Sequence, residues 1–542
     1  MKRAQEKHLE KLGAFEIAFK MLSLAKNNEK QNIFLNAGRG NPNWINTIAR
    51  GAFARLVQFG IVESKRTINK FQMAGYTQKD GIYERLETFL QPHDNEEDQF
   101  LLDSISYCEK KFNFDKDDLT KELVDGVIGN DYPVPSRVLN HTEVILNAYL
   151  NSTLYHNCDD KNLMNETRLF PTEGGTAAIT YIFHSLKENK LIHAGDKIAL
   201  NTPIFTPYIQ IPELKEFDIH EVDLRSEECN HWELKSKAIK QLKYPDLKAL
   251  FLVNPSNPAS VKLSDEALKA IQEAVKNNPN LMIITDDVYG TFVDKFESVY
   301  AVAPHNTLLV YSFSKLEGAT GWRLGVIGVH QDNIFDKLIT ELPQEDQKAL
   351  DKRYSSVVFH PEKMHFIDRM VADSRSVGLY HTSGLSTPQQ IMEDLFALAH
   401  LVNEEHEGKD RDCYVEEAKE IVRKRYDDLH KGLNIKEFKS DANARYYSLI
   451  DIYALAAQYY DQDFADWLRN NFEQVDFLVK LSQMNGVVLI DGVGFGAKPG
   501  ILRISEANLP TEDYAIIARQ ILDLMAQYHQ QYENEKNKKK TK

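Results

Sequence analysis

The chain has 542 residues, of which 42% are hydrophobic and 10% aromatic, so it can bury a full-sized core and is not intrinsically disordered. Its 65 basic and 80 acidic residues leave a net charge of −15, which argues against nucleic acid as a partner. No apolar run approaches the ~20 residues of a membrane helix, and no signal-peptide stretch opens the chain. Its 4 cysteines have neither metal-ligand nor disulfide-scaffold spacing. We expect a soluble, cytoplasmic protein with no metal and no membrane partner.

The N-terminal part has a mixed pattern. Apolar residues at helical spacing predict a helix over about 8–27, and a short strand follows at 33–36. The glycines and prolines of residues 37–44 then predict a loop. Residues 80–129 are acidic and mostly helical in pattern, which indicates an added helical segment rather than a separate domain.

From about residue 168, short apolar strands alternate with helices. We predict strands at 197–200, 247–253, 281–285 and 307–311, and helices at 175–186 and 264–276. Continuously apolar strands that alternate with helices indicate a mostly parallel sheet with both faces covered. Such sheets bind ligands at the carboxyl ends of their strands.

The remainder returns to helices and then to mixed structure. Residues 331–435 read as mainly helical, followed by strands at 446–450, 487–490 and 501–504, a helix at 511–528 and a solvated lysine-rich tail at 535–542. We expect an arm and part of a small domain in 1–79, and the inserted helices in 80–129. We expect a large domain in 130–400, with an insertion near 335–380, and a C-terminal small domain in 401–542.

Four short polar segments follow the predicted strands. They are Asn-Pro-Ser-Asn-Pro at 254–258, Asp-Asp-Val-Tyr at 286–289, Ser-Phe-Ser-Lys at 312–315 and Gly-Trp-Arg at 321–323. A lysine amine after a buried strand can form a Schiff base with an aldehyde cofactor. A carboxylate on the preceding strand can keep a pyridine nitrogen protonated, and an arginine among serines suits a phosphate group.

As a set, these segments resemble those of the class I aminotransferase-like enzymes that use pyridoxal 5'-phosphate. The resemblance is strong over residues 130–330 and weaker in the C-terminal part. It implies the aspartate aminotransferase fold (fold type I), an α/β architecture. This fold has a large domain with a mostly parallel sheet and a smaller α/β domain built from the N- and C-terminal segments.

The resemblance assigns roles to individual residues. Lys315 would be the catalytic lysine that binds the cofactor, and Asp286 would pair with the ring nitrogen. Asn257 and Tyr289 would donate to the phenolate oxygen of the cofactor. The cofactor phosphate would lie at a glycine-rich helix N-terminus with a serine and an arginine; these residues are Gly174, Gly175, Thr176, Ser312 and Arg323.

Further positions are assigned around the cofactor ring and the substrate. Phe205 would stack on the ring, with Tyr208 as the alternative, and Tyr132 would reach the phosphate of a neighbouring subunit. The substrate would contact Arg39, Gly40, Asn257 and Arg503, of which Arg503 would hold the α-carboxylate as a bidentate fork. Arg39 could instead be a solvent-exposed loop charge.

The extra segments of this long chain indicate which activity within the family to expect. The extra residues at 80–129 and 335–380, the loop at 36–44 and the lysine segment at 312–323 resemble the aspartate 4-decarboxylases of this family. That resemblance implies decarboxylation of L-aspartate to L-alanine and carbon dioxide, with a side aspartate aminotransferase activity that uses keto acids. It also implies a homodimer as the minimal unit within a larger homo-oligomer. The alternative is an ordinary aspartate or aromatic amino acid aminotransferase.

Overall fold

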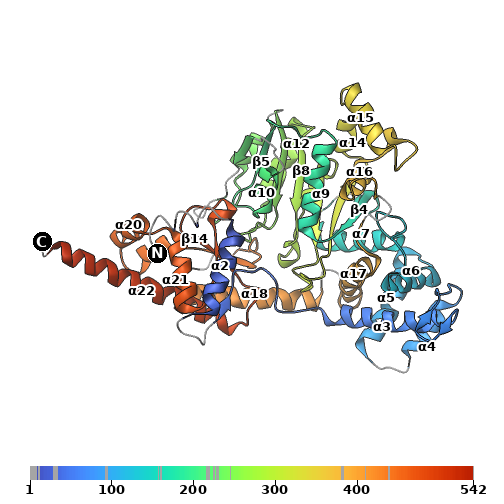
Figure 1. Ribbon diagram of the computed structural model, residues 1–542, viewed down its shortest axis with the longest axis horizontal. Helices are drawn as coiled ribbons and strands as arrows, with labels where there is room; N and C mark the ends of the chain where they lie inside the picture. Colours follow the sequence, from blue (N-terminus) through green and yellow to red (C-terminus); the bar gives the residue numbers. More distant parts are fainter. Residues whose placement is uncertain are drawn as a thin grey trace.

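Figure 1 shows the computed structural model, an elongated molecule with the long C-terminal helix extending from one end. The structure describes residues 6, 9, 13–28, 34–91, 95–156, 158, 162–214, 220–223, 226, 231–243, 246–379, 384–408, 411–436 and 440–540. Within these residues, no helix is long and apolar enough to cross a membrane.

A seven-stranded sheet forms the centre of the larger part, in the order β4-β10-β9-β8-β7-β5-β6. Neighbouring strands from β9 to β6 are parallel, whereas β10 is antiparallel to both β9 and β4. The expectation of a mostly parallel sheet is therefore confirmed. The strands are β4 (Thr167–Thr172), β5 (Lys197–Leu200), β6 (His220–Asp223), β7 (Leu247–Val253), β8 (Met282–Asp286), β9 (Thr307–Ser312) and β10 (Gly325–His330).

Strands β4, β6 and β10 were not predicted from the sequence. Strand β10 contains Gly325 and Gly328, and β4 contains Pro171, residue types that weaken a strand pattern. Both strands are nevertheless almost entirely buried, and the pairing of β10 with both β4 and β9 satisfies backbone groups that burial removes from water.

Alternate residues of β7 pack into two different clusters. Ala249, Phe251 and Val253 join the cluster that contains helix α9 (Gly175–Glu188). Leu250 and Leu252 join the cluster that contains helix α12 (Asp265–Asn277). Since successive side chains of a strand point to opposite faces, these helices cover opposite faces of the sheet.

The smaller α/β part combines both ends of the chain, as the fold expectation requires. Strand β1 (Leu35–Asn36) pairs in parallel with β12 (Val487–Val488), and helix α2 (Ala14–Lys26) packs on α21 (Gln474–Asn485). Its antiparallel sheet has the order β11-β14-β13. The other elements are β11 (Tyr447–Asp451), β13 (Ile490–Asp491), β14 (Ile501–Ser505), α19 (Ile452–Tyr459), α20 (Gln462–Asn471) and α22 (Glu512–Lys540).

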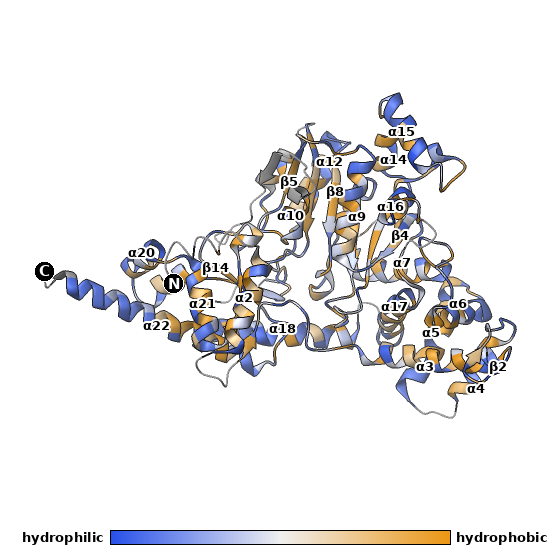
Figure 2. Ribbon diagram, viewed as in Figure 1, coloured by the Kyte–Doolittle hydropathy of each residue, from blue (hydrophilic) through white to orange (hydrophobic). Residues whose placement is uncertain are grey.

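Two expectations about the chain ends need correction. Gly13 has an extended backbone and caps α2, so no single helix runs over residues 8–27; of the residues before it, only 6 and 9 are described. Helix α22 continues to Lys540, so the predicted tail is helical over most of its length. Figure 2 shows that the projecting half of α22 is hydrophilic, which explains why its sequence reads as a solvated tail.

The acidic residues 80–129 are helical, as predicted, and pack with a helix that precedes them. Helices α4 (Ile82–Leu90), α5 (Glu96–Phe112) and α6 (Lys116–Ile128) lie near α3 (Thr47–Ser64), and α17 (Thr387–Glu407) packs on α3, α5 and α6. Asn46, Asn95 and Asp115 cap α3, α5 and α6 by accepting a backbone N–H three residues later. The domain boundaries stay a prediction.

The remaining elements are connecting helices and one hairpin. They are β2 (Asn69–Lys70), β3 (Met73–Ala74), α7 (Asn140–Leu154), α8 (Leu163–Glu166), α10 (Pro207–Leu214), α11 (Ser236–Ile239), α13 (Val299–Val302), α14 (Ile334–Thr340), α15 (Gln344–Tyr354), α16 (Phe366–Ser374) and α18 (Cys413–Gly432). Residues 331–435 are thus mainly helical, as predicted.

The packing of α9 on the sheet can be tested at Phe251. Its ring is fully buried and stacks on Phe183 at 4.6 Å between centroids. We expect Phe251→Ala to lower stability by about 3–5 kcal/mol, since it leaves a cavity between α9 and β7. Thermal unfolding followed by circular dichroism measures the loss, and Phe359→Ala, at a 99% exposed position, is the matched control. Equal melting temperatures for the two variants would contradict this packing.

Candidate active site

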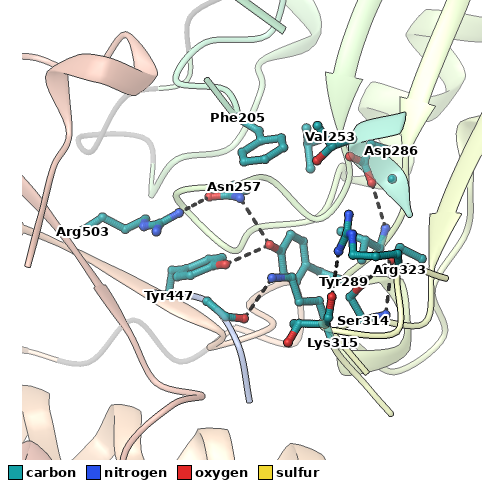
Figure 3. A pocket seen from close by; sticks show the side chains of 16 residues that line it. Phe205, Val253, Asn257, Asp286, Tyr289, Ser314, Lys315, Arg323, Tyr447 and Arg503 are labelled. Carbon is teal, nitrogen blue, oxygen red and sulfur yellow. Dashed lines mark hydrogen bonds between the residues drawn. The ribbon is translucent and has the colours of Figure 1, made fainter. Parts of the chain in front are cut away.

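The carboxyl ends of β7, β8 and β9 open onto a cavity of about 220 Å³ (Figure 3). Because these strands are parallel, the polar segments that follow them meet at one edge of the sheet. Most residues predicted for the site line this cavity, namely Gly40, Gly175, Thr176, Phe205, Asn257, Asp286, Tyr289, Ser312, Lys315, Arg323 and Arg503.

Lys315 lies in the turn after β9, and its amine points into the cavity (Figure 3). The amine donates a hydrogen bond of 2.9 Å to the carbonyl of Gly40, which also accepts one of 2.9 Å from the Tyr446 hydroxyl. Gly40 has no room for a side chain, because an added Cβ would overlap the Tyr447 hydroxyl. The lysine is thus held by a backbone acceptor and has no carboxylate partner among the described residues.

Residues 44–50 fix the turn that carries Lys315. The indole of Trp44 donates to the Leu316 carbonyl at 2.9 Å, and the amide of Asn46 donates to the buried Glu317 carboxylate at 2.9 Å. The guanidinium of Arg50 donates to the carbonyls of residues 317 and 318. Contacts this far apart in sequence place the lysine more rigidly than the local turn could.

Asp286 ends strand β8 at the wall of the cavity. Burial raises the pKa of its carboxyl to about 6, although the Val288 amide, the Tyr208 hydroxyl and the nearby Lys315 oppose the shift. At pH 7 the carboxylate is therefore mostly ionised, and it can pair with a protonated ring nitrogen. The neighbouring Asp287 faces elsewhere and accepts hydrogen bonds from the Thr285 and Ser298 hydroxyls.

The N-terminus of α9 forms an anion cradle with the end of β9. The hydroxyls of Ser312 and Ser314 lie 2.9 Å apart beside this helix end, and the guanidinium of Arg323 faces it. Gly174 has a φ of +84°, and a Cβ there would stand 2.5 Å from Arg323 Nη2. Backbone amides, hydroxyls and a guanidinium at a helix N-terminus are the donor set that binds phosphate.

A chain of hydrogen bonds crosses the cavity from Arg503 on β14. Arg503 is 2% exposed and donates to Asn257 Oδ1 at 3.0 Å and to the Gly38 carbonyl at 2.8 Å. Asn257 in turn donates to the Tyr289 hydroxyl at 3.2 Å. Among the described residues Arg503 forms no ion pair, and its buried Nε has no hydrogen-bond partner. A buried guanidinium in this state is suited to a carboxylate ligand.

The two candidates for ring stacking occupy different places. Phe205 lines the cavity opposite Lys315 (Figure 3). Tyr208 is fully buried, and its hydroxyl donates to Asp286 at 3.4 Å, so it lies behind the cavity wall. This arrangement favours Phe205, but which ring stacks on a ligand stays a prediction.

Two predicted site residues lie away from the cavity. The side chain of Arg39 is exposed, with its guanidinium 5.8 Å from the centroid of the Phe19 ring. Tyr132 is 66% exposed, at the rim of a second surface hollow near Asp131 and His141. The predicted contacts of Arg39 with substrate and of Tyr132 with a neighbouring subunit stay predictions.

Sequence reasoning did not assign five of the residues that line the cavity, namely Val253, Val288, Ser314, Thr320 and Tyr447. The Ser-x-Ser-Lys pattern contains Ser314 and could have indicated it. Tyr447 carries no local signal, because its place in the cavity depends on the pairing of β11 with β14.

Comparisons with known proteins agree with this geometry. Solved aspartate aminotransferases share the fold, with a TM-score of 0.59 and 16% identity for the Thermus thermophilus enzyme with maleate, covering 97% of this chain and 99% of that one. The Rhizobium meliloti enzyme has a TM-score of 0.58 at 14% identity, covering 95% and 96%. The family model "Aminotransferase class I and II" matches residues 147–521.

The chain therefore belongs to the class I and II aminotransferases, a family of pyridoxal phosphate enzymes. Within it, the chain is 41% identical to the bifunctional aspartate aminotransferase and L-aspartate beta-decarboxylase of a Pseudomonas species, over 97% of this chain and 98% of that protein. The cavity fits the family's cofactor, because it combines the amine of Lys315, the Asp286 carboxylate and a phosphate cradle kept open by Gly174.

The cradle can be tested at Gly174. We expect Gly174→Ala to weaken the affinity of the cofactor-free enzyme for pyridoxal phosphate at least about tenfold, because the added methyl displaces the Arg323 guanidinium. Gly195→Ala is the matched control, since Gly195 has a φ of +86° and no atom within 4 Å of the added Cβ. Absorbance titration measures both affinities. Equal affinities in the two variants would show that Arg323 does not contribute to phosphate binding in the cradle.

Proposed function

We propose that this protein is a pyridoxal phosphate-dependent aspartate 4-decarboxylase, which converts L-aspartate to L-alanine and carbon dioxide. The observation that carries the proposal is the identity of 41% to a bifunctional aspartate aminotransferase and L-aspartate beta-decarboxylase across 97% of the chain. That match includes the helical residues 80–129, which lie outside the family model. Aspartate aminotransferase activity with keto acids is the proposed side reaction.

Different residues around the cavity bind the substrate and the cofactor. Arg503 holds the α-carboxylate of aspartate, and its partner Asn257 keeps the guanidinium facing the cavity. The cradle of Gly174, Gly175, Thr176, Ser312, Ser314 and Arg323 holds the cofactor phosphate. Asp286 pairs with the ring nitrogen, Asn257 and Tyr289 face the phenolate oxygen, and Phe205 covers the ring. When bound, pyridoxal phosphate supplies the sink for electrons released from the substrate.

Lys315 moves the protons of the reaction. Its free amine takes the proton from Cα of aspartate, and the Gly40 carbonyl fixes where the amine rests between transfers. Loss of carbon dioxide leaves an electron pair on Cβ, so Cβ and Cα must each receive a proton before alanine forms. The Lys315 ammonium is placed to return the proton that was taken from Cα, and the second proton comes from solvent.

The assembly state is also part of the proposal. A homodimer within a larger homo-oligomer would let the exposed Tyr132 of one subunit approach the phosphate of its neighbour. Sedimentation of the holoenzyme would measure the assembly state.

Product analysis separates decarboxylase from aminotransferase. With L-aspartate as the sole substrate, we expect alanine and carbon dioxide through many turnovers, because decarboxylation needs no keto acid as a second substrate. Carbon dioxide released per active site is the measurement, and Lys315→Ala is expected to abolish it.

An ordinary aspartate or aromatic aminotransferase would behave differently in the same assay. It would stop after about one equivalent without a keto acid, and any carbon dioxide would not exceed what the released oxaloacetate, a β-keto acid, loses on its own. That outcome would exclude the decarboxylase proposal while leaving the family assignment intact.

The role of Arg503 predicts a common loss for two ligands. Aspartate and alanine both present an α-carboxylate. Arg503→Ala should therefore weaken the binding of both ligands by a similar amount, about 2–5 kcal/mol for the loss of a buried charge pair. Arg503→Lys should recover part of this, since an ammonium keeps the charge without the fork. Spectral titration gives the dissociation constants. A loss confined to aspartate would place Arg503 at the side-chain carboxylate instead.

A further inference from the structure

Tyr447 joins the two parts of the active site, although no role was assigned to it from the sequence. It begins strand β11 of the smaller α/β part and is 2% exposed. Its hydroxyl lies 2.9 Å from that of Tyr289, and its ring lies 4.3 Å from the guanidinium carbon of Arg503 (Figure 3). The hydroxyl also borders Gly40, where no larger residue fits.

The orientation of the Asn257 amide fixes the first hydrogen bond to Tyr289. A guanidinium can only donate, so the Asn257 atom 3.0 Å from Arg503 Nη1 must be the carbonyl oxygen Oδ1. The amide nitrogen then faces Tyr289 at 3.2 Å and must donate to its hydroxyl oxygen. One acceptor position of Tyr289 is therefore used by Asn257.

The second hydrogen bond decides where the Tyr289 proton points. If Tyr289 donates to Tyr447, the Tyr447 proton has no acceptor among the described residues; if Tyr447 donates instead, the Tyr289 proton has none and faces the cavity. The second arrangement is selected by the proposed function, which places a ligand oxygen beside Tyr289. Both acceptor positions of Tyr289 are then occupied.

We propose that Tyr447 is a positioning residue that donates to Tyr289 and so directs the Tyr289 proton at the ligand oxygen of the site. The inference rests on the proposed function, in which that oxygen is the phenolate of the cofactor. A hydroxyl that accepts two hydrogen bonds is a stronger donor through its own proton. Tyr447 thereby withdraws electron density from the cofactor ring through Tyr289.

The arrangement also connects the substrate end of the cavity with the cofactor end. The Tyr447 ring lies against Arg503, while its hydroxyl contacts the hydroxyl of Tyr289. A phenylalanine at this position would keep the ring contact with Arg503 and would remove the hydrogen bond to Tyr289.

The test is Tyr447→Phe in the enzyme loaded with pyridoxal phosphate, followed by its visible absorption against pH. A hydrogen-bond donor at the phenolate oxygen lowers the proton affinity of the lysine–cofactor linkage, so a weaker donor should raise the pH midpoint by about half a unit to one unit. The affinity for maleate, a dicarboxylate that cannot react, should change less than about twofold, because the ring beside Arg503 remains.

The chain offers a matched control in another buried pair of tyrosines. Tyr149 and Tyr311 have hydroxyls 2.7 Å apart, and neither residue lines the cavity. Tyr149→Phe removes the same kind of hydrogen bond and should leave the pH midpoint unchanged.

A double variant shows whether Tyr447 acts through Tyr289. The midpoint of Tyr289→Phe with Tyr447→Phe should equal that of Tyr289→Phe alone. Additive shifts, or an unchanged or lower midpoint in Tyr447→Phe, would overturn the inference. If the unaltered enzyme formed no visible band with pyridoxal phosphate, the proposed function itself would fail, which distinguishes the two results.

Discussion

Two neighbouring backbone carbonyls, those of Gly38 and Gly40, hold the cationic side chains at opposite sides of the active site. Gly38 accepts from Arg503 at 2.8 Å, and Gly40 accepts from Lys315 at 2.9 Å. A carbonyl holds a cation in place without neutralising it, whereas a carboxylate would form an ion pair that a substrate must break. The rest of the site depends on this loop, whose continuation through Trp44 and Arg50 is anchored to the lysine turn.

The loop explains how the site keeps buried charge available for ligands. Arg503 and the Asp286 carboxyl lie in protein surroundings that disfavour uncompensated charge, and burial raises the pKa of Asp286 to about 6. A ligand with an anionic carboxylate and a protonated ring nitrogen compensates both. Binding of cofactor and substrate therefore offsets the desolvation cost of these buried groups, which favours ligands with both kinds of charge.

The sequence predicts the large-domain half of the site far better than the other half. Asp286, Ser312 and Lys315 follow strands whose apolar runs are visible in the sequence, and parallel pairing brings such ends together. Tyr447 depends on the register of two strands more than fifty residues apart, which no local pattern encodes. The contact of Arg39 with substrate stays a prediction: the sequence indicates its loop, and its exposed side chain lies beside the Phe19 ring. Strands β4 and β10 were missed because Pro171 and two glycines weaken their local pattern.

The division of the site between two parts of the chain links ligand binding to the packing of those parts. The phosphate cradle belongs to the central sheet, whereas Arg503 and Tyr447 belong to the small antiparallel sheet. A ligand that reaches from the cradle to Arg503 therefore spans the junction that Asn257 and Tyr289 already bridge by hydrogen bonds. Ligand binding therefore stabilises the packing of the two sheets against each other. At a ligand concentration one hundred times the dissociation constant, this stabilisation is about 2.7 kcal/mol. The hydrogen bonds that orient the Tyr289 proton therefore form only when the two parts of the chain that make the site are packed together.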